Sequence, residues 1–175
     1  MMFDVDNMKK TIFFLMLAAC TIGCKAGHEQ TTAVASQQDD VQVEAPNFTL
    51  EDLDGNRLSL TSLRGKYVVV DFWGSWCPWC IKGFPKMKEY YQKYKDKLEI
   101  VGVDCGDTKA KWKAAVAEYE LPWKHVYCPK NSKVIEDYGV QGFPSKVIID
   151  PKGNVVEGIE GEDPRFYTLL DQLLK

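Results

Sequence analysis

Cys77 and Cys80 are separated by two residues, where an expected strand gives way to an expected helix. The apolar run 67–73 before them is typical of a strand buried on both faces, and 87–95 after them is typical of a helix. A helix N-terminus carries partial positive charge and unpaired N–H groups, which favour thiolate over thiol. Pro78 suits the first helical turn, which needs no N–H. Because the thiolate is the nucleophile, the motif predicts a redox switch at Cys77.

Two structural roles compete with this interpretation. A structural disulfide stabilises most when it closes a long loop, whereas this pair would close a very short one. A structural zinc site needs four ligands, usually including a second Cys or His pair at matching spacing. The remaining candidates, Cys105, Cys128 and His125, do not form such a pair. The strand–motif–helix context therefore favours a redox role, with no metal site and no bound cofactor.

The composition is that of one ordinary globular domain. The 175 residues are 45% hydrophobic and 27% charged, and the formal net charge is −3. Lysines gather between residues 82 and 97, but they alternate with acidic residues and tyrosines, which is typical of a solvated helix face. No basic patch stands out, so nucleic acid is not an expected partner.

Residues 1–24 are typical of an export leader. Lys9 and Lys10 precede the uncharged segment 11–19, which is too short to span a bilayer. The segment 17–20 resembles a bacterial lipobox, in which the cysteine becomes the lipidated first residue. We therefore expect export to the cell envelope, facing the periplasm, with a lipid anchor in the membrane.

Two cysteines compete as the lipidation site. The apolar residue three positions upstream favours Cys20. Signal length and parity favour Cys24, because Cys20 gives a very short signal counted from Met8 and lipidation at Cys24 leaves an even number of cysteines in the mature chain. A plain cleaved signal peptide is the weaker alternative. Residues 25–45 are small and polar without hydrophobic period, so we expect a flexible tether before a folded domain at 46–175.

The domain alternates strand and helix patterns. Asp54-Gly55 between two short strand patterns predicts an N-terminal β-hairpin, and a second hairpin is expected around 146–156. Further strands are expected at 67–73, 98–104 and 124–128, with helices at 77–95, 108–119, 131–138 and 163–174. Pro85 should kink the first helix, and Asn131 is a plausible N-cap for the third. The pattern predicts an α/β fold, a central mixed sheet with helices on both faces.

Several separate segments together resemble the exported TlpA/ResA-type thiol-disulfide oxidoreductases, which have the thioredoxin-like fold. The resemblance covers about 46–175. It is carried by the N-terminal hairpin region 46–66, the active-site run 70–80, Pro85 five residues after the second cysteine, and the loop 142–145 before a strand.

The resemblance implies a role for each motif residue. Cys77 would be the exposed nucleophile, and Cys80 the more buried cysteine that resolves the mixed disulfide. Pro144 would be cis and would pack against the cysteine pair, shaping the surface on which the substrate backbone docks. From the residues alone, Pro144 reads as a strand-entry proline. We expect substrate contacts from Trp76, Pro78, Trp79 and Phe143, whereas Trp73 belongs to the core.

One position departs from the pattern. Many TlpA/ResA-type proteins carry a glutamate three residues after the second cysteine, where this chain has Gly83. Thioredoxins instead place a buried aspartate six residues before the first cysteine, which here is Asp71. A buried carboxyl has a raised pKa and can exchange protons near neutrality. We expect Asp71 to deprotonate Cys80; a merely solvated or capping aspartate is the alternative.

A second cysteine pair follows from the expected sheet. Cys105 follows one expected strand and Cys128 ends the next. If these strands are parallel neighbours, the two cysteines lie side by side at the active-site end of the sheet. In an oxidising compartment a structural disulfide is the favoured interpretation. A second redox pair that relays electrons and two buried free thiols are the alternatives.

The expected activity is disulfide exchange with protein substrates, supplied with electrons by an upstream membrane donor. The resemblance favours the reducing direction, for example in cytochrome c maturation or envelope thiol maintenance. The sequence alone does not fix the direction, because potentials of such motifs span about 150 mV. A thiol peroxidase is disfavoured by the paired cysteines. A Cu(I)-handling module could use the same thiolates, but His28 and His125 lie away from the cis-proline loop.

Overall fold

The computed structural model describes residues 42–175, so the expected leader, both candidate lipidation cysteines and most of the expected tether lie outside the described residues. The elements run in the order β1 (Thr49–Asp52), β2 (Arg57–Ser59), the 3-10 helix η2 (Leu60–Leu63), β3 (Tyr67–Trp73), α1 (Pro78–Tyr94), β4 (Leu98–Cys105), α2 (Lys109–Glu118), β5 (Lys124–Cys128), α3 (Val134–Asp137), β6 (Ser145–Ile149), β7 (Val155–Glu160) and α4 (Pro164–Leu174).

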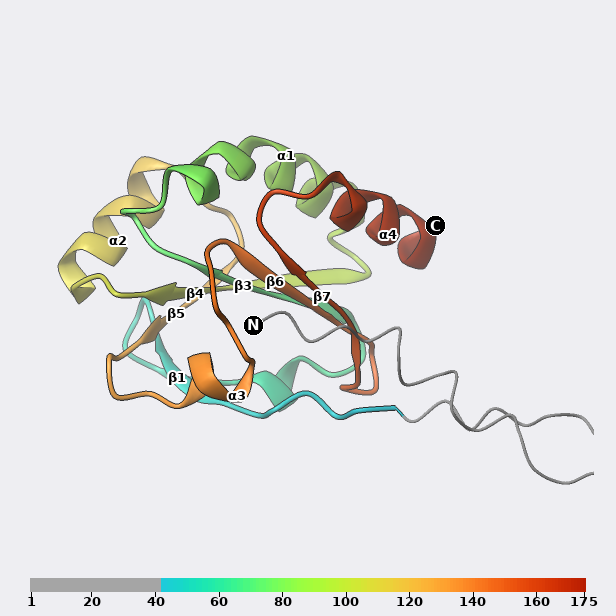
Figure 1. The fold of residues 1–175 in the computed structure, drawn as a ribbon, viewed down its shortest axis with the longest axis horizontal. Coiled ribbons are helices and arrows are strands. Elements are labelled where there is room, and N and C mark those ends of the chain that lie inside the picture. Colours follow the sequence, from blue (N-terminus) through green and yellow to red (C-terminus); the bar gives the residue numbers. More distant parts are fainter. Residues whose placement is uncertain (1–41) are drawn as a thin grey trace, which may run out of the picture. The chain divides into compact units, whose positions relative to one another are not determined.

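The seven strands form one mixed sheet in the order β2-β1-β5-β4-β3-β6-β7 (Figure 1). Strands β3, β4 and β5 are parallel, whereas β6 runs antiparallel to β3 and β7 antiparallel to β6. The expected hairpin at Asp54-Gly55 forms, and its strand β1 joins the sheet beside β5. The carboxyl ends of the three parallel strands meet at one edge, which is where the cysteine motif follows β3.

Alternation along the strands sorts the core into two layers. Val69 and Trp73 of β3 pack in one cluster with residues of α1, α2 and α4. Val70 and Phe72 pack in the other cluster, with residues of η2 and α3. The predicted fold class is confirmed, but the cover is uneven, with α1, α2 and α4 on one face of the sheet (Figure 1). Asp71, between Val69 and Trp73, shares the face of α1.

The third predicted helix is shorter than expected. The expectation that Asn131 is its N-cap is wrong, because α3 begins at Val134 with Lys133 as its N-cap, and a turn closed by the Ser132 amide and the Pro129 carbonyl precedes it. The Ser132 hydroxyl accepts a hydrogen bond from the Val134 amide, at the start of α3. Pro85 lies inside α1, as expected.

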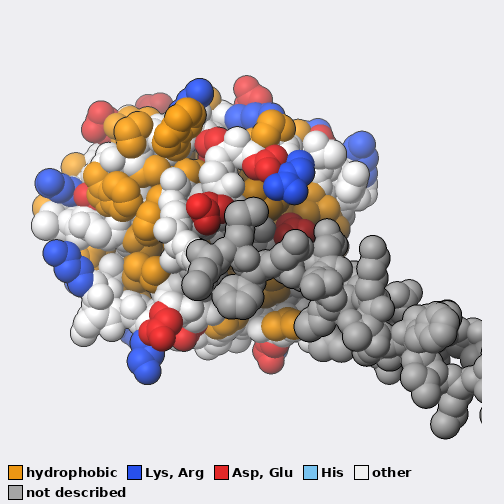
Figure 2. Space-filling view, viewed as in Figure 1, with side chains coloured by type: hydrophobic (Ala, Val, Ile, Leu, Met, Phe, Trp, Pro, Cys, Tyr) orange, Lys and Arg blue, Asp and Glu red, His pale blue; other side chains and the backbone are white. Residues whose placement is uncertain are grey.

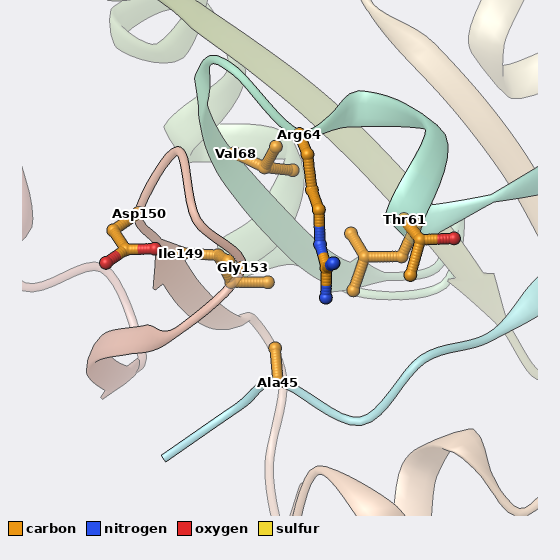
Figure 3. A pocket seen from close by; sticks show the side chains of 8 residues that line it. Ala45, Thr61, Arg64, Val68, Ile149, Asp150 and Gly153 are labelled. Carbon is orange, nitrogen blue, oxygen red and sulfur yellow. The ribbon is translucent and has the colours of Figure 1, made fainter. Parts of the chain in front are cut away.

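Residues 43–45, which the sequence pattern assigns to the tether, pair with the β6–β7 turn. The Ala45 amide donates to the Gly153 carbonyl, and Glu44 forms a bridge with Asn154. Glu44 also pairs with Arg64, whose side chain runs toward Ala45 through a small pocket (Figure 3). Backbone hydrogen bonds do not depend on the side chains, so this pairing produces no pattern of apolar residues from which the sequence could predict it.

The surface carries no large field of one sign on the face shown in Figure 2, where acidic and basic side chains are interspersed. Within residues 42–175, no helix has the length and apolar character needed to cross a membrane.

Candidate active site

The cysteine motif forms a disulfide at the start of α1. Cys77 and Cys80 are joined by an S–S bond of 2.07 Å, with their Cα atoms 5.3 Å apart. Cys77 is the N-cap of α1, and its Sγ accepts a hydrogen bond from the Cys80 amide at 3.1 Å. An amide aimed at the sulfur stabilises negative charge there once the disulfide is reduced. The geometry fits Cys77 as the thiolate.

The expected difference in exposure between the two cysteines is small. Cys77 is 3% exposed and Cys80 is 1% exposed, so the expectation of an exposed nucleophile is corrected for this disulfide-bonded form. The Cys77 sulfur is directed back toward its own helix by its bond to Cys80 and by its hydrogen bond with the Cys80 amide.

The loop before the cysteines is tied to the end of β4. The Asp107 carboxylate accepts hydrogen bonds from the Ser75 amide at 2.7 Å and the Ser75 hydroxyl at 2.8 Å. The Trp76 indole donates to the Cys105 carbonyl at 2.9 Å. Gly74 is required beneath that indole, because a Cβ atom there would overlap the Trp76 ring. These contacts fix the motif on its strand, and the sequence pattern did not reveal Asp107.

The Phe143–Pro144 peptide bond is cis, as the resemblance implies. Phe143 packs edge-on against Trp76, with ring centroids 5.2 Å apart, so the proline loop lies beside the cysteine motif. The Pro144 carbonyl accepts a hydrogen bond from the Gly161 amide, which ties this loop to the segment that enters α4.

Large apolar side chains around the motif are open to solvent. Trp76 is 52% exposed and Trp79 is 60% exposed, and Pro78 between them is also exposed. Lys82 lies 4.8 Å from the centroid of the Trp79 ring. Trp73, in contrast, is completely buried, as expected. Trp76, Trp79 and Phe143 thus form an aromatic rim beside the cysteines, with Pro78 between the two tryptophans in sequence.

Asp71 is 1% exposed and lies between Val69 and Trp73 on the face of β3 that packs against α1. Its pKa is raised to about 6, chiefly by burial; the Lys146 ammonium lowers the pKa and the Glu162 carboxylate raises it, and both effects are included in that value. Lys146 Nζ lies 3.8 Å from Asp71 Oδ1 and 2.6 Å from Glu162 Oε1. A carboxyl in this state can take up and release a proton near neutral pH.

The Glu162 carboxylate occupies the space beside Gly83, the position at which the resemblance implies a helix glutamate. A Cβ atom at Gly83 would overlap the Glu162 carboxylate, which reaches α1 from the segment before α4. The missing side chain at Gly83 therefore makes room for a carboxylate from elsewhere in the chain. Sequence reasoning missed both Glu162 and Lys146. Of the two, only Lys146 was recognisable from the sequence, because a charged residue inside an apolar strand requires a partner of opposite charge.

Cys105 and Cys128 are opposite each other in the β4–β5 register, but they are free thiols, both buried. The favoured expectation of a disulfide is not met, and the arrangement is that of two buried thiols. Their side chains pack in the cluster on the sheet face opposite α1. They thus share the sheet edge with Cys77 but not its face, because β4 alternates between Asp104 and Cys105.

His125 lies on the α1 face of β5 and is 2% exposed. Burial lowers its pKa to about 4, so the ring is neutral at physiological pH. No group of three or more His, Cys, Asp or Glu side chains with metal-binding geometry occurs within residues 42–175.

Comparison with known proteins matches residues 41–157 to the AhpC/TSA family. A thiol-disulfide oxidoreductase ResA of Bacillus cereus (strain ATCC 10987 / NRS 248) is 33% identical over 170 residues, which cover 95% of this chain and 96% of that protein. The ResA of Bacillus subtilis (strain 168) is 32% identical over 156 residues, 87% of each chain.

Solved structures agree with the sequence relatives. The thioredoxin domain of a thiol-disulfide oxidoreductase from Bacteroides vulgatus is 33% identical with a TM-score of 0.69, covering 77% of this chain and 97% of that one. A putative thiol:disulfide interchange protein DsbE from Chlorobium tepidum is 30% identical with a TM-score of 0.69, and the match covers 75% of this chain and 92% of that one. With its disulfide at the head of α1 and its cis-proline loop alongside, this chain belongs to the AhpC/TSA family of thioredoxin-fold proteins, as a thiol-disulfide oxidoreductase of the ResA type.

Proposed function

We propose that the protein reduces disulfides in protein substrates of the cell envelope, with Cys77 as nucleophile, Cys80 as resolving cysteine and Asp71 as the base for Cys80. The observation that carries this is the Cys77–Cys80 disulfide at the N-terminus of α1, together with a fully buried carboxyl on the sheet face that packs against α1, whose pKa is raised to about 6. A base tuned close to neutral pH is suited to proton transfer under physiological conditions.

The reaction starts from the dithiol form. The Cys77 thiolate attacks one sulfur of the substrate disulfide, forming a mixed disulfide and releasing the first substrate thiolate. Cys80 then transfers its proton to Asp71 and attacks the Cys77 sulfur. This step releases the second substrate thiolate and regenerates the Cys77–Cys80 disulfide. Two electrons pass to the substrate, and a membrane dithiol donor restores the protein.

The aromatic rim would supply the apolar part of the substrate contact, with the cis-proline loop supplying the backbone contact. Trp76 and Trp79 offer exposed ring surface on both sides of Pro78, and aromatic rings of this kind contribute strongly to protein–protein contacts. The reducing direction is supported by the ResA and DsbE relatives. Cytochrome c maturation is one process that needs such a reductant.

The envelope location rests on the N-terminal sequence. The positive and apolar leader, the adjoining Cys20 and Cys24, and the polar segment that follows support export and a lipid anchor facing the periplasm. Labelling cells with a radioactive fatty acid tests the anchor. Wild-type protein should carry label, and loss of the label in either Cys20→Ala or Cys24→Ala identifies the modified residue.

Insulin reduction tests the activity, with dithiothreitol as the electron source. The wild type should accelerate reduction, and Cys77→Ala should abolish the acceleration. Cys80→Ala should instead accumulate mixed disulfides with substrate proteins in cells, because no thiol remains to resolve them. Absence of turnover together with tight Cu(I) binding would favour the copper-handling alternative, and turnover of hydroperoxides without disulfide reductase activity would favour a peroxidase.

A further inference from the structure

Three charged groups form a closed set at the sheet face that packs against α1. Asp71 comes from β3, Lys146 from β6 and Glu162 from the segment between β7 and α4. The side chains of Lys146 and Asp71 are 1% and 2% exposed, and that of Glu162 is 17% exposed. Glu162 is therefore the only one of the three with an appreciable opening to solvent.

The ammonium is shared unequally between the two carboxylates. Lys146 Nζ is 2.6 Å from Glu162 Oε1 but 3.8 Å from Asp71 Oδ1, which has no hydrogen-bond partner. The hydroxyl of Tyr167 in α4 donates to the other Glu162 oxygen at 3.4 Å. Glu162 thus holds Lys146 at a distance from Asp71 that is longer than a hydrogen bond.

The net charge of these three groups depends on whether Asp71 is protonated. One ammonium neutralises one carboxylate, so the set is neutral when Asp71 is protonated and carries one excess negative charge when Asp71 is ionised. Excess charge is costly in a buried site. The set can therefore take up a single proton, and the position of Lys146 between its two partners determines how readily it does so.

The set also contacts the catalytic helix. The Glu162 carboxylate lies against Gly83, one helical turn after Cys80, and Lys146 follows the cis Pro144 by two residues. Glu162 thus touches the helix that carries Cys80, and Lys146 lies on the strand that follows the cis-proline loop.

We propose that Lys146 and Glu162 are positioning residues that together set the pH range in which Asp71 accepts the Cys80 proton. This inference rests on the role proposed above for Asp71. Removing Glu162 frees Lys146 to pair directly with Asp71, which then remains ionised to lower pH. Removing the Lys146 charge leaves Asp71 beside an uncompensated carboxylate, which keeps it protonated to higher pH. The two changes act in opposite directions, which a merely structural ion pair does not require.

Other titratable groups face Asp71 from the elements packed around it. They are Tyr167 on α4, the cysteine pair of α1, and, farther along the same sheet face, Asp104 on β4 and His125 on β5. The proposed variants leave all of these in place, so a shift with opposite sign in the two variants is assigned to the ion pair.

Stopped-flow reaction of the reduced full-length protein with one equivalent of Ellman's reagent measures the two chemical steps separately. Attack by Cys77 releases the first thionitrobenzoate, and resolution by Cys80 releases the second. Cys80→Ala lacks the second phase and gives the background from the other cysteines. The wild-type second phase should accelerate with pH, with its midpoint near the Asp71 pKa of about 6.

Glu162→Gln should move this midpoint about one pH unit lower and Lys146→Met about one pH unit higher, each a roughly tenfold change in the Asp71 equilibrium. Lys146→Arg, which keeps the charge, should remain close to the wild type. Circular dichroism checks that each variant folds, and the first phase should change little. If Lys146→Met does not fold, Glu162→Gln decides alone.

Unchanged midpoints, or shifts in the same direction for both variants, overturn the proposal. Asp71→Asn separates this failure from failure of the proposed function. If the second phase is slow in Asp71→Asn but the midpoints of the ion-pair variants do not move, Asp71 is the base and the positioning role of Lys146 and Glu162 is refuted. If the second phase of Asp71→Asn is as fast as that of the wild type, both the role of Asp71 as base and the positioning role of Lys146 and Glu162 are refuted.

Discussion

Asp71 meets two demands that oppose each other. Its burial raises the pKa from 3.8 to about 6, which suits a base but makes the ionised form unfavourable in the folded protein. The folded state therefore binds the Asp71 proton more tightly than the unfolded chain. The contribution of Asp71 to the free energy of unfolding, about 3 kcal/mol, is fully present below about pH 4 and is lost as the pH rises to about 6.

Asp71→Asn should reveal this cost, because asparagine does not titrate. At pH 7 the variant should be more stable than the wild type by up to about 3 kcal/mol, and the difference should vanish below about pH 4. The same variant should resolve mixed disulfides about a hundredfold more slowly. Urea unfolding at both pH values measures the first effect, and the Ellman's reagent assay measures the second. A variant that is less stable at both pH values to the same extent would contradict the argument.

Gly83 and Glu162 share one space, and a second carboxylate should not fit. Gly83→Glu should destabilise the protein by about 2–4 kcal/mol through overlap and like-charge repulsion against Glu162. Adding Glu162→Ala should recover at least half of the loss, giving a coupling energy above about 1 kcal/mol in a double-mutant cycle. Urea unfolding of the wild type, the two single variants and the double variant measures it. Additive effects would show that the two positions do not share the space.

Single residues were predictable where chemistry is local in sequence. Cys77, Cys80 and the cis Pro144 follow from short motifs and their resemblance. Asp71 stood out as the acid inside an apolar strand. Glu162 did not, because its place against Gly83 depends on how the segment before α4 folds over α1, which no local pattern encodes.

Among the elements, β4 and β5 carry their cysteines away from the catalytic helix. Cys105 and Cys128 are paired in register, but they pack with the η2 and α3 side of the sheet. The strands themselves were predictable from their apolar runs. The face on which each cysteine lies depends on the register of β3 against β4, where one residue of slip exchanges the faces, and the sequence alone does not specify that register.

Both thiols should be free in the oxidised protein. Unfolding without reductant in the presence of iodoacetamide should alkylate Cys105 and Cys128 but not Cys77 or Cys80, as read by peptide mapping. Before unfolding, both thiols should react slowly, because Cys105 and Cys128 are each only 2% exposed. A peptide that links Cys105 to Cys128 would contradict the free-thiol arrangement.

Taken as one molecule, residues 42–175 place the Cys77–Cys80 sulfurs and two large exposed aromatic side chains, Trp76 and Trp79, in the same region. The fold class was predictable, because alternating strand and helix patterns allow few other architectures. The uneven cover of the sheet was not, since α2 packs beside α1 through contacts distant in sequence. Nor do sequence patterns show that Cys77 is nearly as buried as Cys80 in the disulfide form.

The aromatic rim predicts a difference between large and small substrates. Trp76 and Trp79 are exposed by 52% and 60%, so a protein substrate can bury their rings, whereas a small disulfide reaches the sulfurs without covering them. Trp79→Ala should reduce kcat/KM for insulin roughly tenfold, about 1.4 kcal/mol. The rate with Ellman's reagent should stay within about twofold, because no chemical group is lost. Trp79→Phe, which keeps an aromatic ring, is the matched control and should retain most of the activity. Equal losses on both substrates would place Trp79 in the chemistry rather than in docking.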